Sequence, residues 1–305
     1  MYETKVRRVH LDDVQHDPMF GEALRIWEAT VGGAGIAAAS AALSAICDPA
    51  TNLFHSDMNA NSVLAYKVKT LRQAFDLRQS RGEEIGNYPD AAYIDSVLAP
   101  NYTAATNENA PIFRRIMTPM VGTFAIYEGI LLPYFDQEGR NALSLSRLLY
   151  LADGVELTEP VTLTNQEARC LEQLAKGLSA KQIAYALKIS ERTVEHHIEH
   201  IKLSLGVSNG PHAVAKGIFA LGMKGRPQAQ NDAGRSLWNL TVRERQCLSL
   251  LTSGHPAKAI AEAISVSAKT VEKHLRGARV KLGAKNAVDL VAKGAAVAVS
   301  ALDEA

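Results

Sequence analysis

Apolar residues in the second half of the chain recur at the three- and four-residue spacing of short helices, and the whole pattern occurs twice. Residues 163–214 and 240–291 align without a gap at an offset of 77 positions. The first apolar face of each copy holds a Cys–Leu pair at the same place, beginning at Cys170 and at Cys247. A repeat of this length predicts a duplicated unit of about 60 residues that is built from helices.

Capping residues predict where the helices of each copy begin and end. Thr164 with Glu167, and the equivalent T-x-x-E of the second copy, have the spacing of a capping box, in which the hydroxyl and the carboxylate bind amides of the first turn. Gly177 predicts the end of that first helix. Ser179 and Ser190 precede a second and a third helix, and a tight turn between these two predicts a helix-turn-helix.

Both copies resemble the LuxR-type helix-turn-helix domains of transcription regulators. The motifs that carry the resemblance are L-T-x-x-E, then G-x-x-x-K-x-I-A, then S-x-x-T-V-x-x-H, then L-G, in this order in each copy. The second copy also has Arg243 and Lys281 where the family usually has them, whereas the first has Gln166 and Ser204. The second copy departs from the family at Pro256, where a serine cap is usual. The resemblance covers about 120 of 305 residues and implies third helices that enter the DNA major groove.

The resemblance also implies which side chains touch the bases: the two residues after the Thr–Val pair, and the residue two past the following histidine. These are Glu272, Lys273 and Arg276 in the second copy, and Glu195, His196 and Glu199 in the first. Lysine and arginine donate to guanine, whereas glutamate accepts from cytosine and is repelled by phosphate. We therefore expect the second copy to be the main reader of sequence. The other DNA contacts that we expect are Lys181, Arg192, Thr193 and Lys202 in the first copy, and Lys258, Lys269, Thr270, Arg279 and Lys281 in the second.

Neither a metal nor a cofactor is predicted. Residues 196–200 match H-x-x-E-H, an inverted zinc-protease motif, but the second copy has Lys273 and Gly277 where His196 and His200 stand. The chain has three cysteines without a C-x-x-C spacing, which argues against a disulfide framework and a cysteine zinc site.

The first half of the chain, residues 1–158, has a mixed pattern. The elements that we expect are a helix over residues 37–46, short strands over 53–55 and 63–68, a short helix over 71–77, and strands over 111–117, 121–133 and 143–150, with a turn at 136–139. Short helices followed by antiparallel strands predict an α+β sensor domain.

This half resembles a PAS-like domain, and the resemblance implies ligand sensing or dimerisation without naming a ligand. The residues that carry it are 66–68, 71–77, Gly82, Tyr93, Ile94, Pro111, 127–133 and Gly139. A receiver domain is a rival interpretation, because Asp12, Asp13 and Asp57 imitate an acid pair and a phosphoacceptor. Against it, no lysine lies between positions 69 and 176, and residues 6–10 are too polar for a buried parallel strand. An acyl-homoserine-lactone pocket fits poorly, because Trp27 is the only tryptophan in this half.

Charge separates the two halves although the whole chain has a net charge of only +1. Residues 1–158 hold 13 Lys and Arg against 19 Asp and Glu, whereas residues 237–300 hold 10 against 4. An acidic front and a basic back favour a regulatory half and a polyanion-binding half. The sequence has neither a signal-peptide pattern nor an apolar stretch long enough to span a bilayer, so a cytoplasmic location is expected.

We therefore predict a multidomain chain: an α+β PAS-like sensory or dimerisation domain over residues 1–155, and two all-α four-helix LuxR-type domains over 160–223 and 237–300, with a linker over 224–236. The predicted function is a bacterial, sequence-specific, DNA-binding transcription regulator that is not an enzyme. Its expected partners are double-stranded DNA and a second copy of the chain, and its N-terminal half senses a signal or dimerises. Two alternatives stay open: an adaptor or anti-activator that contacts another regulator or RNA polymerase, and a response regulator controlled by phosphorylation.

Overall fold

The computed structural model describes residues 4–33, 35–74, 84–120, 123–136, 139–153, 161–219, 221 and 237–303. Contacts divide the chain into two compact units. The sheet unit comprises Thr4–Val121 and Ala125–Leu148, and the helical unit comprises Met1–Glu3, Gly122–Phe124 and Leu149–Ala305.

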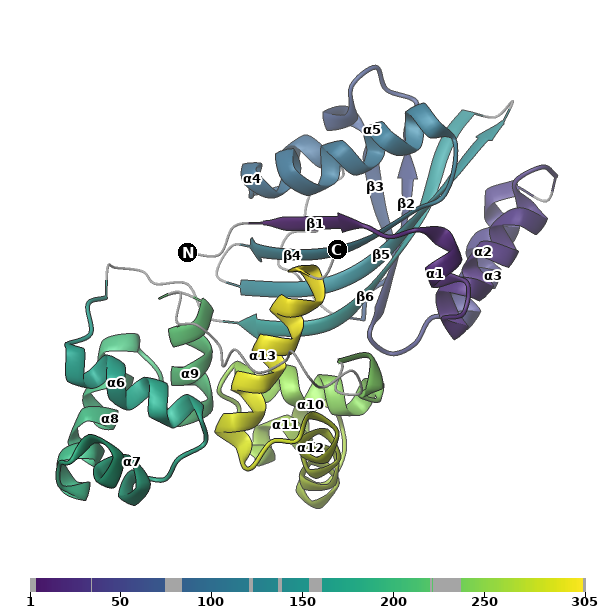
Figure 1. The fold of residues 1–305 in the computed structure, drawn as a ribbon. Coiled ribbons are helices and arrows are strands. Elements are labelled where there is room, and N and C mark those ends of the chain that lie inside the picture. The colour runs from purple at the N-terminus through teal and green to yellow at the C-terminus, as the bar shows by residue number, and fades with distance from the viewer. Residues whose placement is uncertain are drawn as a thin grey trace. The chain divides into compact units, whose positions relative to one another are not determined.

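The strands that the structure describes form one six-stranded sheet in the order β1–β4–β5–β6–β2–β3 (Figure 1). They span Lys5–Arg8 (β1), Thr51–Asp57 (β2), Lys67–Arg72 (β3), Ile112–Met120 (β4), Thr123–Asp136 (β5) and Gly139–Asp153 (β6). β1 pairs antiparallel with β4, and β2 pairs antiparallel with both β3 and β6. The receiver interpretation needed a buried parallel strand before Asp12, and β1 is not one.

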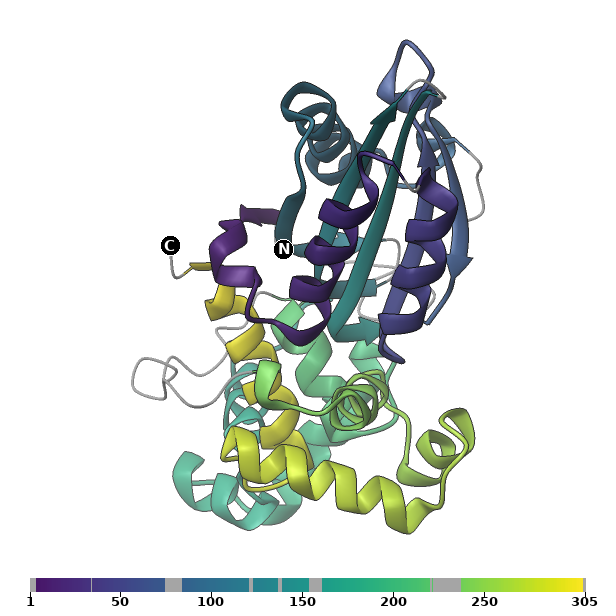
Figure 2. The same ribbon diagram turned by 90° about the vertical axis from the view of Figure 1, so that its right-hand side faces the viewer.

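Helices of the sheet unit cover both faces of the sheet. They span Leu11–Val14 (α1), Pro18–Thr30 (α2), Gly35–Ile46 (α3), Ala91–Tyr93 (α4) and Ala99–Glu108 (α5), with short turns of helix at Val63–Ala65 (η1), Ile85–Asn87 (η2) and Ile94–Leu98 (η3). Figure 2 shows the purple helices α2 and α3 lying along one face. Because neighbouring residues of a strand point to opposite faces, Phe113 packs with the cluster under α2 and α3, whereas Ile112 packs with the cluster under α5. The predicted α+β class is confirmed.

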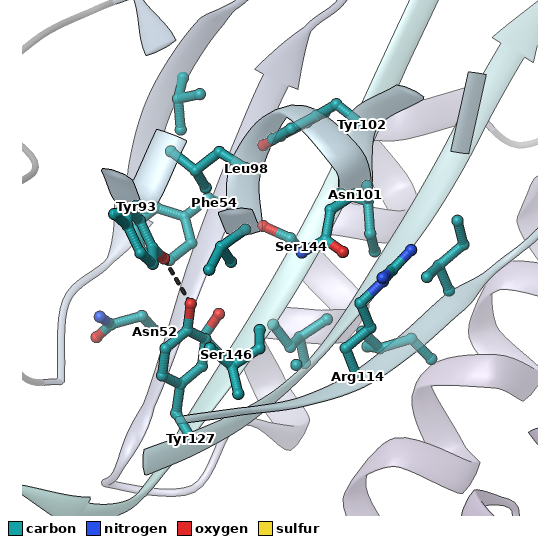
Figure 3. Close-up of a pocket in the computed structure, with 18 of the residues that line it drawn as sticks. Asn52, Phe54, Tyr93, Leu98, Asn101, Tyr102, Arg114, Tyr127, Ser144 and Ser146 are labelled. Atoms are coloured by element: carbon teal, nitrogen blue, oxygen red, sulfur yellow. Dashed lines mark hydrogen bonds between the residues drawn. The ribbon is translucent and has the colours of Figure 1, made fainter. Parts of the chain in front are cut away.

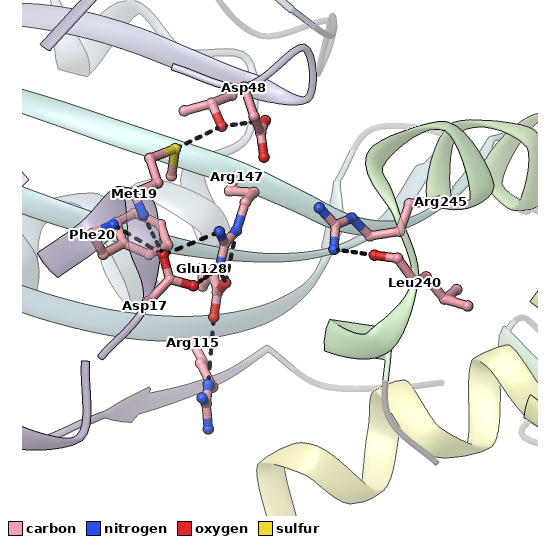
Figure 4. Close-up of polar contacts among 10 residues, drawn as sticks. Asp17, Met19, Phe20, Asp48, Arg115, Glu128, Arg147, Leu240 and Arg245 are labelled. Carbon is pink, nitrogen blue, oxygen red and sulfur yellow. Dashed lines mark hydrogen bonds and ion pairs between the residues drawn. The ribbon is translucent and has the colours of Figure 1, made fainter. Parts of the chain in front are cut away.

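An ionic cluster ties the start of α2 to the sheet (Figure 4). Asp17 caps α2 by accepting the amides of Met19 and Phe20, both at 3.0 Å. The Arg147 guanidinium of β6 donates to the Asp17 carboxylate at 2.6 Å and also pairs with Glu128 of β5. Burial raises the pKa of Asp17, but Arg147 and the two amides outweigh it and leave the pKa below its usual value.

The helical unit contains both copies of the repeat. The first copy has helices Asn165–Ala175 (α6), Ala180–Leu187 (α7), Glu191–Leu205 (α8) and Gly210–Phe219 (α9). The second has a short turn at Leu237–Asn239 (η4) and helices Val242–Thr252 (α10), Ala257–Ala263 (α11), Ala268–Leu282 (α12) and Ala287–Asp303 (α13). Both predicted capping boxes form; in the first, Glu167 accepts the Thr164 amide at 2.8 Å and Thr164 accepts the Glu167 amide at 3.3 Å. At Pro256, the position that departs from the family, α11 begins without a side-chain cap.

Two local predictions in the first half are wrong. Residues 63–65 form η1 instead of the start of a strand, and Leu71 and Arg72 end β3 instead of beginning a helix. The reason is that β3 alternates exposed and half-buried residues but contains few apolar side chains. Its sequence therefore lacks the alternation of apolar and polar residues by which a strand is predicted. The predicted linker over 224–236, Gly82, residues 137–138 of the predicted turn and residues 75–77 lie outside the described residues.

Candidate nucleic-acid interface

The predicted base-reading positions of the second copy lie on the exposed face of α12. Glu272, Lys273 and Arg276 are all exposed. The opposite face, which includes Val271 and Leu282, is buried against the other helices of the copy. The helix period thus separates a packing stripe from a polar ridge, and the ridge carries two cations and one carboxylate.

The same face of α8 in the first copy is exposed but differs in charge. Glu195, His196 and Glu199 are exposed, and Val194 is buried on the opposite face. The Lys202 ammonium donates to the Glu199 carboxylate at 2.6 Å. A predicted phosphate contact therefore lies next to a carboxylate of its own helix, which weakens its attraction to a polyanion.

The other predicted DNA contacts surround these ridges. Lys181, Arg192, Thr193, Lys258 and Lys269 are exposed, and Thr270, Arg279, Lys202 and Lys281 are half-buried. The Thr193 hydroxyl lies 2.7 Å from the Ser190 hydroxyl, and the Thr270 hydroxyl lies 2.8 Å from that of Ser267, at the first turns of α8 and α12. The roles of these residues in DNA binding stay predictions.

A buried glutamate at the start of each copy contacts a different side chain. In the second copy, Lys281 donates to Glu244 at 2.7 Å, and burial, which raises the pKa of Glu244, is outweighed by Lys281 and the Thr241 amide. A Cβ added at Gly277 would lie 2.3 Å from the Glu244 carboxylate, so glycine leaves room for that pair. In the first copy, His200 stands at the position of Gly277, and its Nδ1 contacts Glu167 directly.

The histidine motif of α8 contacts the capping glutamate of its own copy, and the two cysteines of the repeat are buried. His200 is turned to Glu167, and no group of three His, Cys, Asp or Glu in the described ranges could hold a metal ion. Cys170 and Cys247 are buried, and burial raises the pKa of Cys247 to about 11, which keeps the thiol protonated. No described helix has the length and apolar content that crossing a bilayer requires.

The two copies contact each other through equivalent residues in exchanged roles. The Asn209 side-chain amide donates to the Gly254 carbonyl at 2.6 Å, and the Asn286 side-chain amide donates to the Gly177 carbonyl at 2.8 Å. Asn209 and Asn286 are equivalent under the 77-residue offset, and so are Gly177 and Gly254. An interface has two-fold character when residue i of the first copy contacts residue j of the second, and residue j of the first copy also contacts residue i of the second.

Close packing supports this interface. The fourth helices, α9 and α13, pack against each other, and Val214 and Val291 are fully buried at equivalent positions. A Cβ added at Gly177 would lie 2.8 Å from Asp289 of the other copy, and one added at Gly254 would lie 2.6 Å from His212. This contact was not predicted from the sequence. The recurrence of an asparagine at positions 209 and 286, just before the fourth helix of each copy, could have indicated it.

One family model, described as bacterial regulatory proteins of the luxR family, matches the chain twice, at residues 161–216 and 238–293. The chain carries two luxR-type helix-turn-helix domains. The resemblance seen in the sequence is thereby confirmed for both copies. The Transcriptional activator protein AhyR of Aeromonas hydrophila and the Transcriptional activator protein AsaR of Aeromonas salmonicida are each 38% identical to the chain over 56 residues. Those residues are 18% of this chain and 22% of each relative, so the match spans about one luxR-type domain.

Among solved structures, a VqmA dimer of Vibrio cholerae is 15% identical, with a TM-score of 0.19. The match covers 43% of this chain and 65% of that one. SdiA in complex with octanoyl-rac-glycerol is 14% identical with a TM-score of 0.20, and the match covers 69% of this chain and 88% of that one. TM-scores this low do not relate the overall folds.

Proposed function

We propose that this protein is a bacterial, cytoplasmic, sequence-specific transcription regulator whose helical unit binds double-stranded DNA. The observation that carries the proposal is the pair of luxR-type domains whose third helices expose polar ridges, with Lys273 and Arg276 on the second. The sheet unit senses a signal or dimerises. The partial relatives AhyR and AsaR are named transcriptional activators, which supports a role in transcription but not its direction.

One chain occupies two half-sites. The exchanged contacts of Asn209 and Asn286 give the two copies two-fold character, and two-fold proteins read half-sites in inverted orientation. We therefore expect an inverted, two-part operator that needs one chain, where most helix-turn-helix proteins need a dimer. Dimerisation through the sheet unit would then present four domains.

The two half-sites are read unequally. Lys273 and Arg276 can each donate to guanine, and a good contact of this kind discriminates by about 1–3 kcal/mol. Glu195 and Glu199 reduce the attraction of α8 to phosphate, so the first copy contributes less affinity and favours cytosine. The operator is expected to have one strong and one weak half.

Selection from a random duplex pool with the full-length protein tests the proposal. The Lys273→Ala/Arg276→Ala variant should lose the strong half-site, and the Glu195→Ala/His196→Ala variant should alter only the weak one. The matched control is Arg25→Ala/Lys67→Ala, which removes the same charge from exposed positions of the sheet unit. An enriched motif that survives Lys273→Ala/Arg276→Ala unchanged would reject α12 as the main reader. Sedimentation of the complex should give one chain per two-part site.

An adaptor is the second candidate, and the exposed Glu195 and Glu199 favour it for the first copy. In that case α8 contacts a basic surface of another regulator or of RNA polymerase. Selection would then return a single half-site, unaffected by changes in α8. Binding to a purified polymerase would instead fall when Glu195 and Glu199 are both changed to Gln.

A further inference from the structure

The sheet unit contains a partly open cavity of about 110 Å³ between its sheet and the helices η3 and α5 (Figure 3). Alternate residues of β4 and β5 form its floor, because every second side chain of a strand points to the same face. Val97, Leu98 and Tyr102 close it from the helical side. The walls are mostly apolar and aromatic.

One charged side chain lines this cavity among the described residues, and part of its guanidinium has no hydrogen-bond partner. Arg114 rises from β4 toward Asn101 of α5 (Figure 3). Its Nε is buried without a hydrogen bond, and so is the side-chain oxygen of Asn101. The nearby Glu108 carboxylate is engaged by Arg8, whose Nη1 donates to it at 2.6 Å. Burial lowers the pKa of Arg114, as does repulsion from Arg8, and only Glu108 opposes them.

Three tyrosine hydroxyls in the cavity are hydrogen-bonded and neutral. The hydroxyls of Tyr93 and Tyr127 hydrogen-bond to each other, and the Tyr102 hydroxyl lies 2.6 Å from Ser56. Burial raises the pKa of all three phenols, so none supplies a negative charge to Arg114. A buried guanidinium N–H without an acceptor is unfavourable, and an anion that enters the cavity supplies one.

We propose that this cavity binds a small carboxylate carried by a single ring or a short branched chain. The carboxylate pairs with Arg114, and a hydroxyl or amino group on the ligand donates to Asn101. The volume of about 110 Å³ is below the roughly 150 Å³ that accommodates benzene, and the cavity is partly open to the surface, so a ring would extend partly out of it. That such a ligand is the regulator's signal rests on the proposed function, whereas the binding itself does not.

Calorimetry with the full-length protein, in the absence of DNA, tests the binding. The probes are benzoate, 4-hydroxybenzoate and 3-methylbutanoate, each beside its neutral amide. At least one carboxylate should bind, at least tenfold more tightly than its amide. If 4-hydroxybenzoate is the tighter aromatic probe, Asn101→Leu should abolish its advantage over benzoate. Binding of none of the three, or equal binding of carboxylate and amide, would overturn the proposal.

The variant Arg114→Met should weaken the carboxylate at least tenfold and leave the amide unchanged. Its matched control is Arg140→Met, an exposed arginine outside the cavity. Unchanged carboxylate affinity in Arg114→Met would overturn the proposal. If that variant fails to fold, the comparison of carboxylate with amide on the unaltered protein still decides. DNA selection is scored separately, so carboxylate binding without an enriched motif would reject the proposed function alone.

Discussion

Alanine at Gly254 should separate the two luxR-type domains. Gly254 has φ of +85°, a left-handed conformation that costs an alanine about 1–2 kcal/mol. The added Cβ would also lie 2.6 Å from Nδ1 of His212 in the other domain, so that side chain must move. Gly206 is the matched control, because it ends α8 at φ of +62° and a Cβ there meets nothing within 4 Å.

The expected magnitude follows from these contacts. Gly206→Ala should lower the free energy of unfolding by the strain alone, about 1–2 kcal/mol. Gly254→Ala adds about 1–3 kcal/mol of overpacking and about 1 kcal/mol for the strained hydrogen bond from Asn209. Gly254→Ala should therefore cost about 2–4 kcal/mol more than its control. Gly177→Ala, which meets Asp289 at 2.8 Å, should behave like Gly254→Ala.

Urea unfolding of the full chain, followed by circular dichroism at the helical band, measures these differences. The midpoint should fall in the order of wild type, Gly206→Ala, then Gly254→Ala and Gly177→Ala together. Equal midpoints for Gly206→Ala and Gly254→Ala would mean that the two domains do not hold each other in solution. That result would also reject the inference that one chain reads two half-sites at a fixed spacing.

Two ion pairs give further predictions. Lys281→Ala should lower the free energy of unfolding of the second luxR-type domain by about 1 kcal/mol. The loss is no larger because the lysine side chain is 36% exposed and solvent screens its pair with Glu244. The control Lys285→Ala should have no effect. Because the folded-state pKa of Glu244 is lowered, this stabilisation is present at neutral pH and is lost as the pH falls through that value, so urea midpoints of wild type and Lys281→Ala should converge in acid. Arg147→Met should cost about 3 kcal/mol in the same assay, because it removes the cation in direct contact with the buried Glu128 and leaves Arg115 at 3.6 Å, and adding Glu128→Gln should recover part of the loss. A double variant no more stable than Arg147→Met would refute that account.

Local signals made the helical unit predictable from its sequence. Capping boxes and apolar spacing involve residues within one or two helical turns, so the pattern at Thr164 and Glu167 fixes α6 without tertiary information. The contact between the domains is different, because Asn209 meets Gly254 only once both copies are folded. A repeat in the sequence indicates that such equivalents exist, but not that they touch.

The sheet unit illustrates a second limit. Arg114 and Arg115 are neighbours in one apolar strand, and the alternation of that strand sends them to opposite faces. Arg115 approaches Glu128 at 3.6 Å, whereas Arg114 enters the cavity. The sequence shows that the two arginines face apart, but not which face carries the ligand cavity, because that depends on where α5 packs. The same dependence on packing hid β3, whose polar residues suit an edge strand.

An exchange of reading residues between the domains would separate the positions that read bases from those that only support the fold. His196→Lys/Glu199→Arg gives α8 the same three residues that α12 has at Glu272, Lys273 and Arg276. The changed side chains are exposed, and the Lys202 pair that is lost contributes at most about 0.5 kcal/mol, so folding should be unaffected. Each new cation can add about 1–3 kcal/mol of discrimination, and the motif selected from random duplexes should become a symmetric inverted repeat with two strong halves. The reverse exchange, Lys273→His/Arg276→Glu, should leave two weak halves and little enrichment. A motif that stays asymmetric in the first variant would show that the sequence is read from other positions, even if both domains bind DNA.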